Sequence, residues 1–116
     1  MTAHNTPPPR RHAGHIAARL ALAACCGFGS TAHANLALAK KNGCIGCHAA
    51  ATTLVGPAYQ AVAARYAGDA NALETVVRSI RQGGSGKWGE LPMPPQAQLS
   101  EADTRRLAAW ILRGAK

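Results

Sequence analysis

The chain has 116 residues, of which 47% are hydrophobic but only 4% aromatic, so it is long enough for one small domain with a thin core. Such a core is marginally stable unless a cross-link or a bound group supports it. Lys and Arg outnumber Asp and Glu by 13 to 5, but the basic residues are scattered and do not alternate with aromatic residues. This distribution argues against nucleic-acid binding, for which a clustered basic surface is expected.

Residues 1–34 have the pattern of an export signal rather than of a folded domain. Arginines precede an apolar run over residues 20–29, and Ala32-His33-Ala34 is a small-x-small cleavage site. The apolar run is too short to span a bilayer, which takes about 20 residues. We therefore predict a signal peptide that is cleaved after Ala34, a periplasmic location without a membrane span, and a mature domain over residues 35–116.

A lipoprotein signal is the alternative for the same segment. Leu22-Ala23-Ala24-Cys25 resembles the motif at which bacterial lipoproteins are cut, and cleavage there would leave Cys25 as a lipidated N-terminus. That cleavage would leave an apolar region shorter than the roughly seven residues that an export signal uses. Cleavage after Ala34 is the preferred interpretation.

The mature chain is expected to begin with a short helix over residues 36–42, with Asn35 as its N-cap and Gly43 ending it. The helix leads to Cys44-Ile45-Gly46-Cys47-His48, which has the form of a c-type haem attachment site. Two thiols at this spacing can add to the vinyl groups on one edge of a porphyrin, and the next histidine can offer a ring nitrogen to the iron. The motif predicts one covalently bound haem c.

Two other kinds of site use the same residue types. A thiol-redox Cys-x-x-Cys motif is expected beside a βαβ pattern, and this chain has no alternation typical of strands. A structural zinc site requires four Cys or His ligands, whereas Cys44, Cys47 and His48 are the only Cys or His residues beyond residue 34. Both alternatives are therefore disfavoured relative to haem.

Three further helices are predicted, over residues 57–66, 72–82 and 101–113, each with an apolar stripe at helical spacing. The stripes are Ala58, Val62 and Tyr66 in the first helix, Leu73, Val76, Val77 and Ile80 in the second, and Leu107, Trp110 and Ile111 in the third. Asn71 and Ser100 are the expected N-caps, and Asp103 stands where a capping-box carboxylate would lie. The sequence thus predicts an all-α fold of four short helices.

A long loop over residues 83–99 precedes the last helix and contains Pro92-Met93-Pro94-Pro95. Loops of this length in small domains are usually functional, and prolines stiffen the backbone. Haem iron in an electron carrier takes a second axial ligand from the protein, and no second histidine remains beyond the signal peptide. Met93 is the only methionine there, so we predict it as the sixth ligand rather than as a core-filling side chain.

Several short motifs follow one another in a recognisable order over residues 35–116. They are Cys44-x-x-Cys47-His48, Val55-Gly56-Pro57-Ala58-Tyr59, Trp88-Gly89, Pro92-Met93-Pro94-Pro95 and a C-terminal helix with Trp110. This order resembles the small bacterial class I cytochromes c, and most closely the cytochrome c-551 type. The resemblance implies four short helices wrapped around one haem, which is covalently attached through Cys44 and Cys47.

The resemblance also implies roles for individual residues. His48 and Met93 would be the axial ligands of the haem iron. The Pro57 carbonyl would accept the proton of the other His48 ring nitrogen, and the Trp88 indole N–H would donate to a haem propionate.

Two positions depart from the pattern of that family. Gln96 follows Pro-Met-Pro-Pro, where the family often has Asn. Ser79 precedes Ile80, where a basic residue often reaches a propionate, and Arg78 lies about 100° further round the helix. We expect these differences to affect the redox potential and its pH dependence, and not the fold or the ligation.

The resemblance implies a soluble, monomeric, periplasmic carrier of respiratory electrons, and not an enzyme. Its partners would be redox proteins such as a periplasmic nitrite reductase, a terminal oxidase or a quinol-oxidising complex, met through small and brief interfaces. One alternative is a haem enzyme or gas sensor in which Met93 is absent from the iron, although few carboxylates and no second histidine are available as distal groups. The other is a haem subunit of a larger reductase or oxidase.

Overall fold

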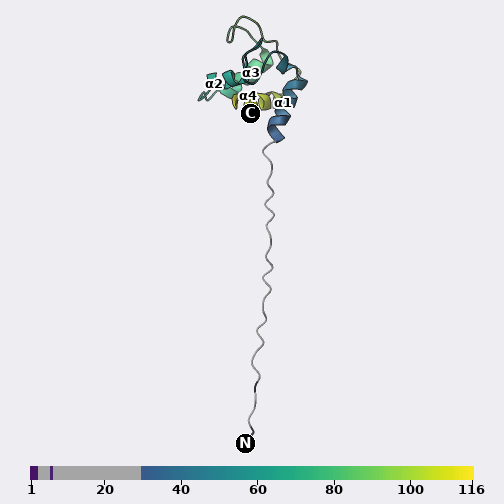
Figure 1. The fold of residues 1–116 in the computed structure, drawn as a ribbon, viewed down its shortest axis with the longest axis vertical. Helices are drawn as coiled ribbons and strands as arrows, with labels where there is room; N and C mark the ends of the chain where they lie inside the picture. The colour runs from purple at the N-terminus through teal and green to yellow at the C-terminus, as the bar shows by residue number, and fades with distance from the viewer. Residues whose placement is uncertain (3–5, 7–29) are drawn as a thin grey trace.

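The computed structural model describes residues 1–2, 6 and 30–116, so most of the predicted signal peptide, with the alternative site at Cys25, lies outside the described residues. The described part contains helices α1 (Ser30–Lys41), α2 (Tyr59–Arg65), α3 (Ala72–Gln82) and α4 (Glu101–Leu112), and a short 3-10 helix, η1 (Cys44–Gly46). It has no β-strand and only isolated bridges. The predicted all-α fold of four short helices is confirmed (Figure 1).

Helix α4 is the element against which the other helices pack. It contacts α1, α2 and α3. Figure 1 shows α4 below α3, with α2 on one side and α1 on the other. Its predicted apolar stripe, Leu107, Trp110 and Ile111, is buried. The stripe of α3 also faces this core, with Val76, Val77 and Ile80 buried and Leu73 partly buried.

The N-caps of α3 and α4 lie at the predicted residues but work differently. Ser100 Oγ accepts a hydrogen bond from the Asp103 backbone N–H at 3.0 Å, as expected of a serine cap. The Asp103 carboxylate lies 3.7 Å from Arg106 Nη1 and so forms an ion pair in place of the reciprocal half of a capping box. Asn71 makes no side-chain cap; its own N–H donates to Asp69 Oδ1 at 2.8 Å.

Helix α1 begins earlier than predicted. It starts at Ser30, so Asn35 lies inside the helix and is 3% exposed, and the prediction of Asn35 as an N-cap is wrong for the uncleaved chain. A physical reason is that Ala32 and Ala34, two good helix formers, precede Asn35 and allow the helix to begin before it. The predicted cleavage point after Ala34 therefore falls within the first turns of α1.

Helix α2 begins at Tyr59, later than the predicted start at Pro57. The backbone N–H groups of Tyr59 and Gln60 donate to the carbonyls of Ala49 and Ala50, each at 3.0 Å. These groups would otherwise be unsatisfied at the start of a helix. The start of α2 is thus fixed by the segment that follows the attachment motif, which is a tertiary contact.

Among the residues that the structure describes, no helix combines the length and the apolar character that crossing a membrane requires.

The cap of α4 gives a test of this packing. Ser100→Ala removes the acceptor for the Asp103 N–H, and we expect the free energy of unfolding to fall by about 1 kcal/mol. Denaturant titration of the protein purified with its native complement of cofactor measures the loss. Ser100→Thr keeps the acceptor and is the control; an equal loss in both variants would show that the cap contributes nothing.

Candidate haem site

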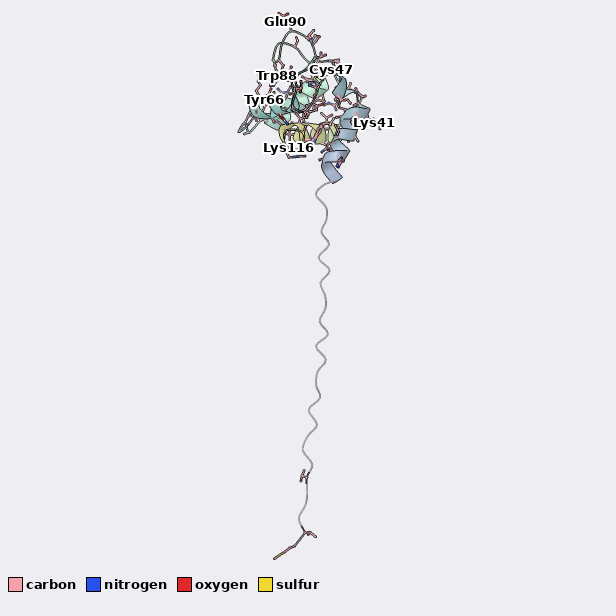
Figure 2. The ribbon with its side chains drawn as sticks, in the orientation of Figure 1. Lys41, Cys47, Tyr66, Trp88, Glu90 and Lys116 are labelled. Carbon is pink, nitrogen blue, oxygen red and sulfur yellow. The ribbon has the colours of Figure 1, made fainter. Side chains whose placement is uncertain are left out.

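One cavity of about 300 Å³ brings the predicted site residues together. Cys44, Cys47, His48, Pro57, Trp88 and Met93 all line it. Much of the remaining wall is apolar and comes from α2, α3 and α4: Val62, Val76, Ile80, Leu107 and Ile111. Figure 2 shows Cys47 and Trp88 at the end of the molecule where the 83–99 loop projects, with Glu90 in that loop. The cavity therefore lies between the attachment motif and the loop that carries Met93.

The 3-10 turn η1 places the two thiols. His48 N–H donates to the Cys44 carbonyl at 3.0 Å, which folds the motif back on itself. Cys44 is half-buried and Cys47 is exposed, and neither forms a disulfide. Burial raises the pKa of the Cys44 thiol above its ordinary value, so this group is not an activated thiolate at neutral pH. That property disfavours the thiol-redox alternative.

The His48 ring is held on three sides. Its Nδ1 lies 2.8 Å from the Pro57 carbonyl oxygen. Because a carbonyl oxygen only accepts, Nδ1 is the donor, and in the neutral ring Nε2 is then the nitrogen with a free lone pair. The Tyr59 ring stacks on the imidazole with centroids 5.5 Å apart and planes 15° apart. On a further side stands Gly56, where any Cβ would overlap the ring atoms.

Met93 is fixed by hydrogen bonds of the loop backbone. Its N–H donates to the Gly84 carbonyl at 2.9 Å, and its own carbonyl accepts from the Gly84 N–H at 3.0 Å. Gly83 turns beneath this pair with φ of 66°, and a Cβ there would overlap the Met93 carbonyl oxygen. Beyond the prolines, the Gln96 N–H donates to the Ile80 carbonyl at 3.0 Å. The loop is thus anchored next to the end of α3 at Met93 itself and again at Gln96.

The positions that depart from the family pattern also belong to the site. Ser79 and Gln96 line the cavity, whereas Arg78 does not. Ser79 Oγ donates to the Thr75 carbonyl within α3 at 3.0 Å, and Gln96 Nε2 donates to the Pro94 carbonyl at 3.0 Å. Both side chains are therefore engaged by their own backbone segments.

Sequence reasoning missed two residues that shape the site. Tyr59 was part of a recognised motif but lies outside the i, i+4 stripe of its helix, and the structure places it against His48. Arg65, at the end of α2, stacks its guanidinium over the Trp88 ring, 4.6 Å from the centroid. The position of Tyr59 directly after Gly56-Pro57-Ala58 could have indicated its contact with the site. No sequence pattern could have indicated the role of Arg65, because its partner Trp88 lies in a distant loop.

The donor set fits a covalently attached haem. Two free thiols three residues apart, an imidazole with an available Nε2 and a thioether share one largely apolar cavity. Thioether and imidazole are the axial ligands of electron-transferring c-type haems. All four residues already line the cavity in which the haem would bind.

Comparison with known proteins agrees with the site. The Cytochrome c family matches residues 36–115. Cytochrome c-551 of Allochromatium vinosum is 49% identical over 82 residues, covering 71% of this chain and 87% of that protein. Cytochrome c-552 of Hydrogenobacter thermophilus is 45% identical over 91 residues, covering 78% and 92%. The crystal structure of Nitrosomonas europaea cytochrome c552 has a TM-score of 0.65 at 47% identity, covering 67% of this chain and 96% of that one.

The resemblance seen in the sequence is therefore confirmed. The family implies a covalently bound haem c, for which Cys44 and Cys47 have the required spacing. The chain belongs to the cytochrome c family, as an electron-transfer protein of the c-551 type and not an enzyme.

Proposed function

We propose that this cytochrome is a periplasmic carrier of single electrons whose haem iron is bound by His48 and Met93. The observation that carries the proposal is that one cavity brings both side chains together with the two thiols of the attachment motif. Haem, when bound, supplies an iron centre that changes by one electron and needs no substrate site.

The surroundings of His48 support its role as a ligand. The hydrogen bond from Nδ1 to the Pro57 carbonyl favours the tautomer in which Nε2 is available to the iron. Gly56 and Tyr59 limit rotation of the imidazole. A ring that cannot turn keeps the same geometry in both oxidation states, which is what a carrier requires.

The position of Met93 supports the choice of a carrier over an enzyme or gas sensor. A thioether is a soft, neutral donor that favours the reduced iron and so raises the potential. If His48 and Met93 both bound the iron, no ligand position would be left for a substrate. The paired hydrogen bonds between Gly84 and Met93 hold the thioether-bearing residue in the cavity wall.

The exposed side of the site is where redox partners are proposed to dock. Cys47 is exposed, and Val55 and Leu91, which also line the cavity, are 56% and 69% exposed. A small apolar contact of this kind suits the brief encounters of electron-transfer proteins. The proposed partners are a periplasmic nitrite reductase, a terminal oxidase or a quinol-oxidising complex.

Removal of Met93 tests the ligation. We expect Met93→Ala to lower the midpoint potential by a large fraction of the roughly 0.8 V range that axial ligands control, because the soft donor is lost. The same variant should lose the far-red sulfur-to-iron band of the ferric protein and bind carbon monoxide in the ferrous state. Met93→His should fill the position again at a lower potential. An unchanged band and potential in Met93→Ala would assign the sixth ligand to another group.

Crowding the imidazole tests the His48 environment. Gly56→Ala adds a methyl group that would overlap the ring, and we expect the protein to lose about 1–3 kcal/mol of stability, as for other overpacked sites. The haem absorption and the potential should shift with the ring. Gly46→Ala is the matched control, because a Cβ there meets no protein atom within 4 Å. Equal effects at the two glycines would contradict the proposed contact.

Export is tested by the mass of the periplasmic protein. We expect loss of residues 1–34 and gain of one haem, since residues 32–34 form a cleavage site and the family match begins at residue 36. Cleavage there would shorten α1 and leave Asn35 as the first residue. A chain beginning with lipidated Cys25 would instead establish the lipoprotein alternative.

A further inference from the structure

The loop that precedes Met93 has few attachments to the rest of the protein. Residues 84–92 are all exposed. The paired hydrogen bonds between Gly84 and Met93 close the base of the loop, and the Gly86 N–H donates to the Gly89 carbonyl at 2.8 Å within it. Neither contact fixes the direction in which the loop leans over the cavity.

One side chain from another element reaches this loop. Arg65, the last residue of α2, donates from Nη1 to the Lys87 carbonyl at 2.7 Å. Its guanidinium also lies over the ring of the next residue, Trp88, 4.6 Å from the centroid. Within the described part of the chain, this is the only hydrogen bond between residues 85–92 and another element.

The chemistry of arginine suits both contacts at once. A guanidinium is planar, so its face can stack on an indole while an N–H at its edge donates to a carbonyl in a fixed direction. In the described residues, the ion pairs involve Arg105 and Arg106, and none includes Arg65. The charge of Arg65 therefore acts on the loop carbonyl and the ring rather than on a carboxylate.

Arg65 contacts the cavity only indirectly, through two residues of the loop. Lys87 and Trp88 line the cavity and Arg65 does not. From Trp88 the chain reaches Met93 within a few residues, so a loop held only at its base would leave the segment before Met93 free to move. Holding Lys87 and Trp88 against α2 restricts that segment.

We propose that Arg65 is a positioning residue that fastens the 83–93 loop to α2 and thereby keeps Met93 in place. The inference rests on the function proposed above, in which Met93 binds the iron. It assigns to α2 a part in both halves of the site, since Tyr59 at its start stacks on His48 and Arg65 at its end holds the opposite loop.

The test compares three variants of the haem-loaded protein. Arg65→Ala removes both contacts. Arg65→Lys keeps the charge but cannot stack and donate with the same planar group. Arg113→Ala is the matched control, because Arg113 is also an exposed arginine at the C-terminal end of a helix and contacts neither the loop nor the cavity.

Two measurements are made on each variant. Imidazole titrated into the ferric protein reports how readily Met93 leaves the iron. Amide hydrogen exchange of Gly84, Gly86 and Met93, whose N–H groups are hydrogen-bonded within the loop, reports opening of the loop. In Arg65→Ala we expect imidazole to bind about tenfold more tightly and the loop amides to exchange about tenfold faster, the effect of losing one charge-assisted hydrogen bond and one cation–π contact. Arg65→Lys should lie nearer to Arg65→Ala than to the unmodified protein, and Arg113→Ala should change neither quantity.

The outcomes separate this inference from the proposed function. The role of Arg65 would be overturned if the loop amides of Arg65→Ala exchanged at the rate of the unmodified protein. It would also be overturned if Arg65→Lys matched the unmodified protein in imidazole binding and amide exchange. Neither result would affect the proposed His48/Met93 ligation. If the unmodified protein holds haem without the methionine band, the ligation fails. Loop exchange, which does not depend on that band, then still decides whether Arg65 fastens the loop.

Discussion

The hydrogen bond from His48 Nδ1 to the Pro57 carbonyl is the contact on which the rest of the site depends. It joins the attachment motif to the start of α2 at 2.8 Å. Gly56 makes this approach possible because it has no Cβ. The helix α2 starts just after this contact, at Tyr59, whose N–H is satisfied by the Ala49 carbonyl. One polar contact thus favours the histidine tautomer and sets the ring position.

The two axial candidates are supported by different kinds of structure. His48 is coupled to the core, because Tyr59 stacks on it and Tyr59 in turn packs against Trp110 of α4, with ring centroids 5.4 Å apart. Met93 is only partly buried and depends on backbone hydrogen bonds of an exposed loop. Elements with few buried contacts open at lower free energy than the core. If Met93 binds the iron as proposed, ligation is expected to be lost first on this side of the site, which is also the side that the proposed contact from Arg65 would support.

Much of the fold could be predicted because its signals are local. The stripe of α3 and the serine cap of α4 each depend on residues within one or two turns of helix, and both lie as expected. The starts of α1 and α2 could not be predicted in the same way. For α1, alanines before Asn35 extend the helix; for α2, the first N–H groups bond to Ala49 and Ala50, which lie outside the helix.

The sequence by itself determined the chemical identity of the site. Cys44, Cys47 and His48 stand at a spacing that serves haem attachment, and Met93 is the only methionine beyond residue 34. Only the tertiary structure decided how these groups are held, because the contacts with Tyr59 and Arg65 join segments that no local pattern relates. Stacking on a ring or donating to a carbonyl of another element depends on where the backbone places that partner, and packing against α4 sets this placement.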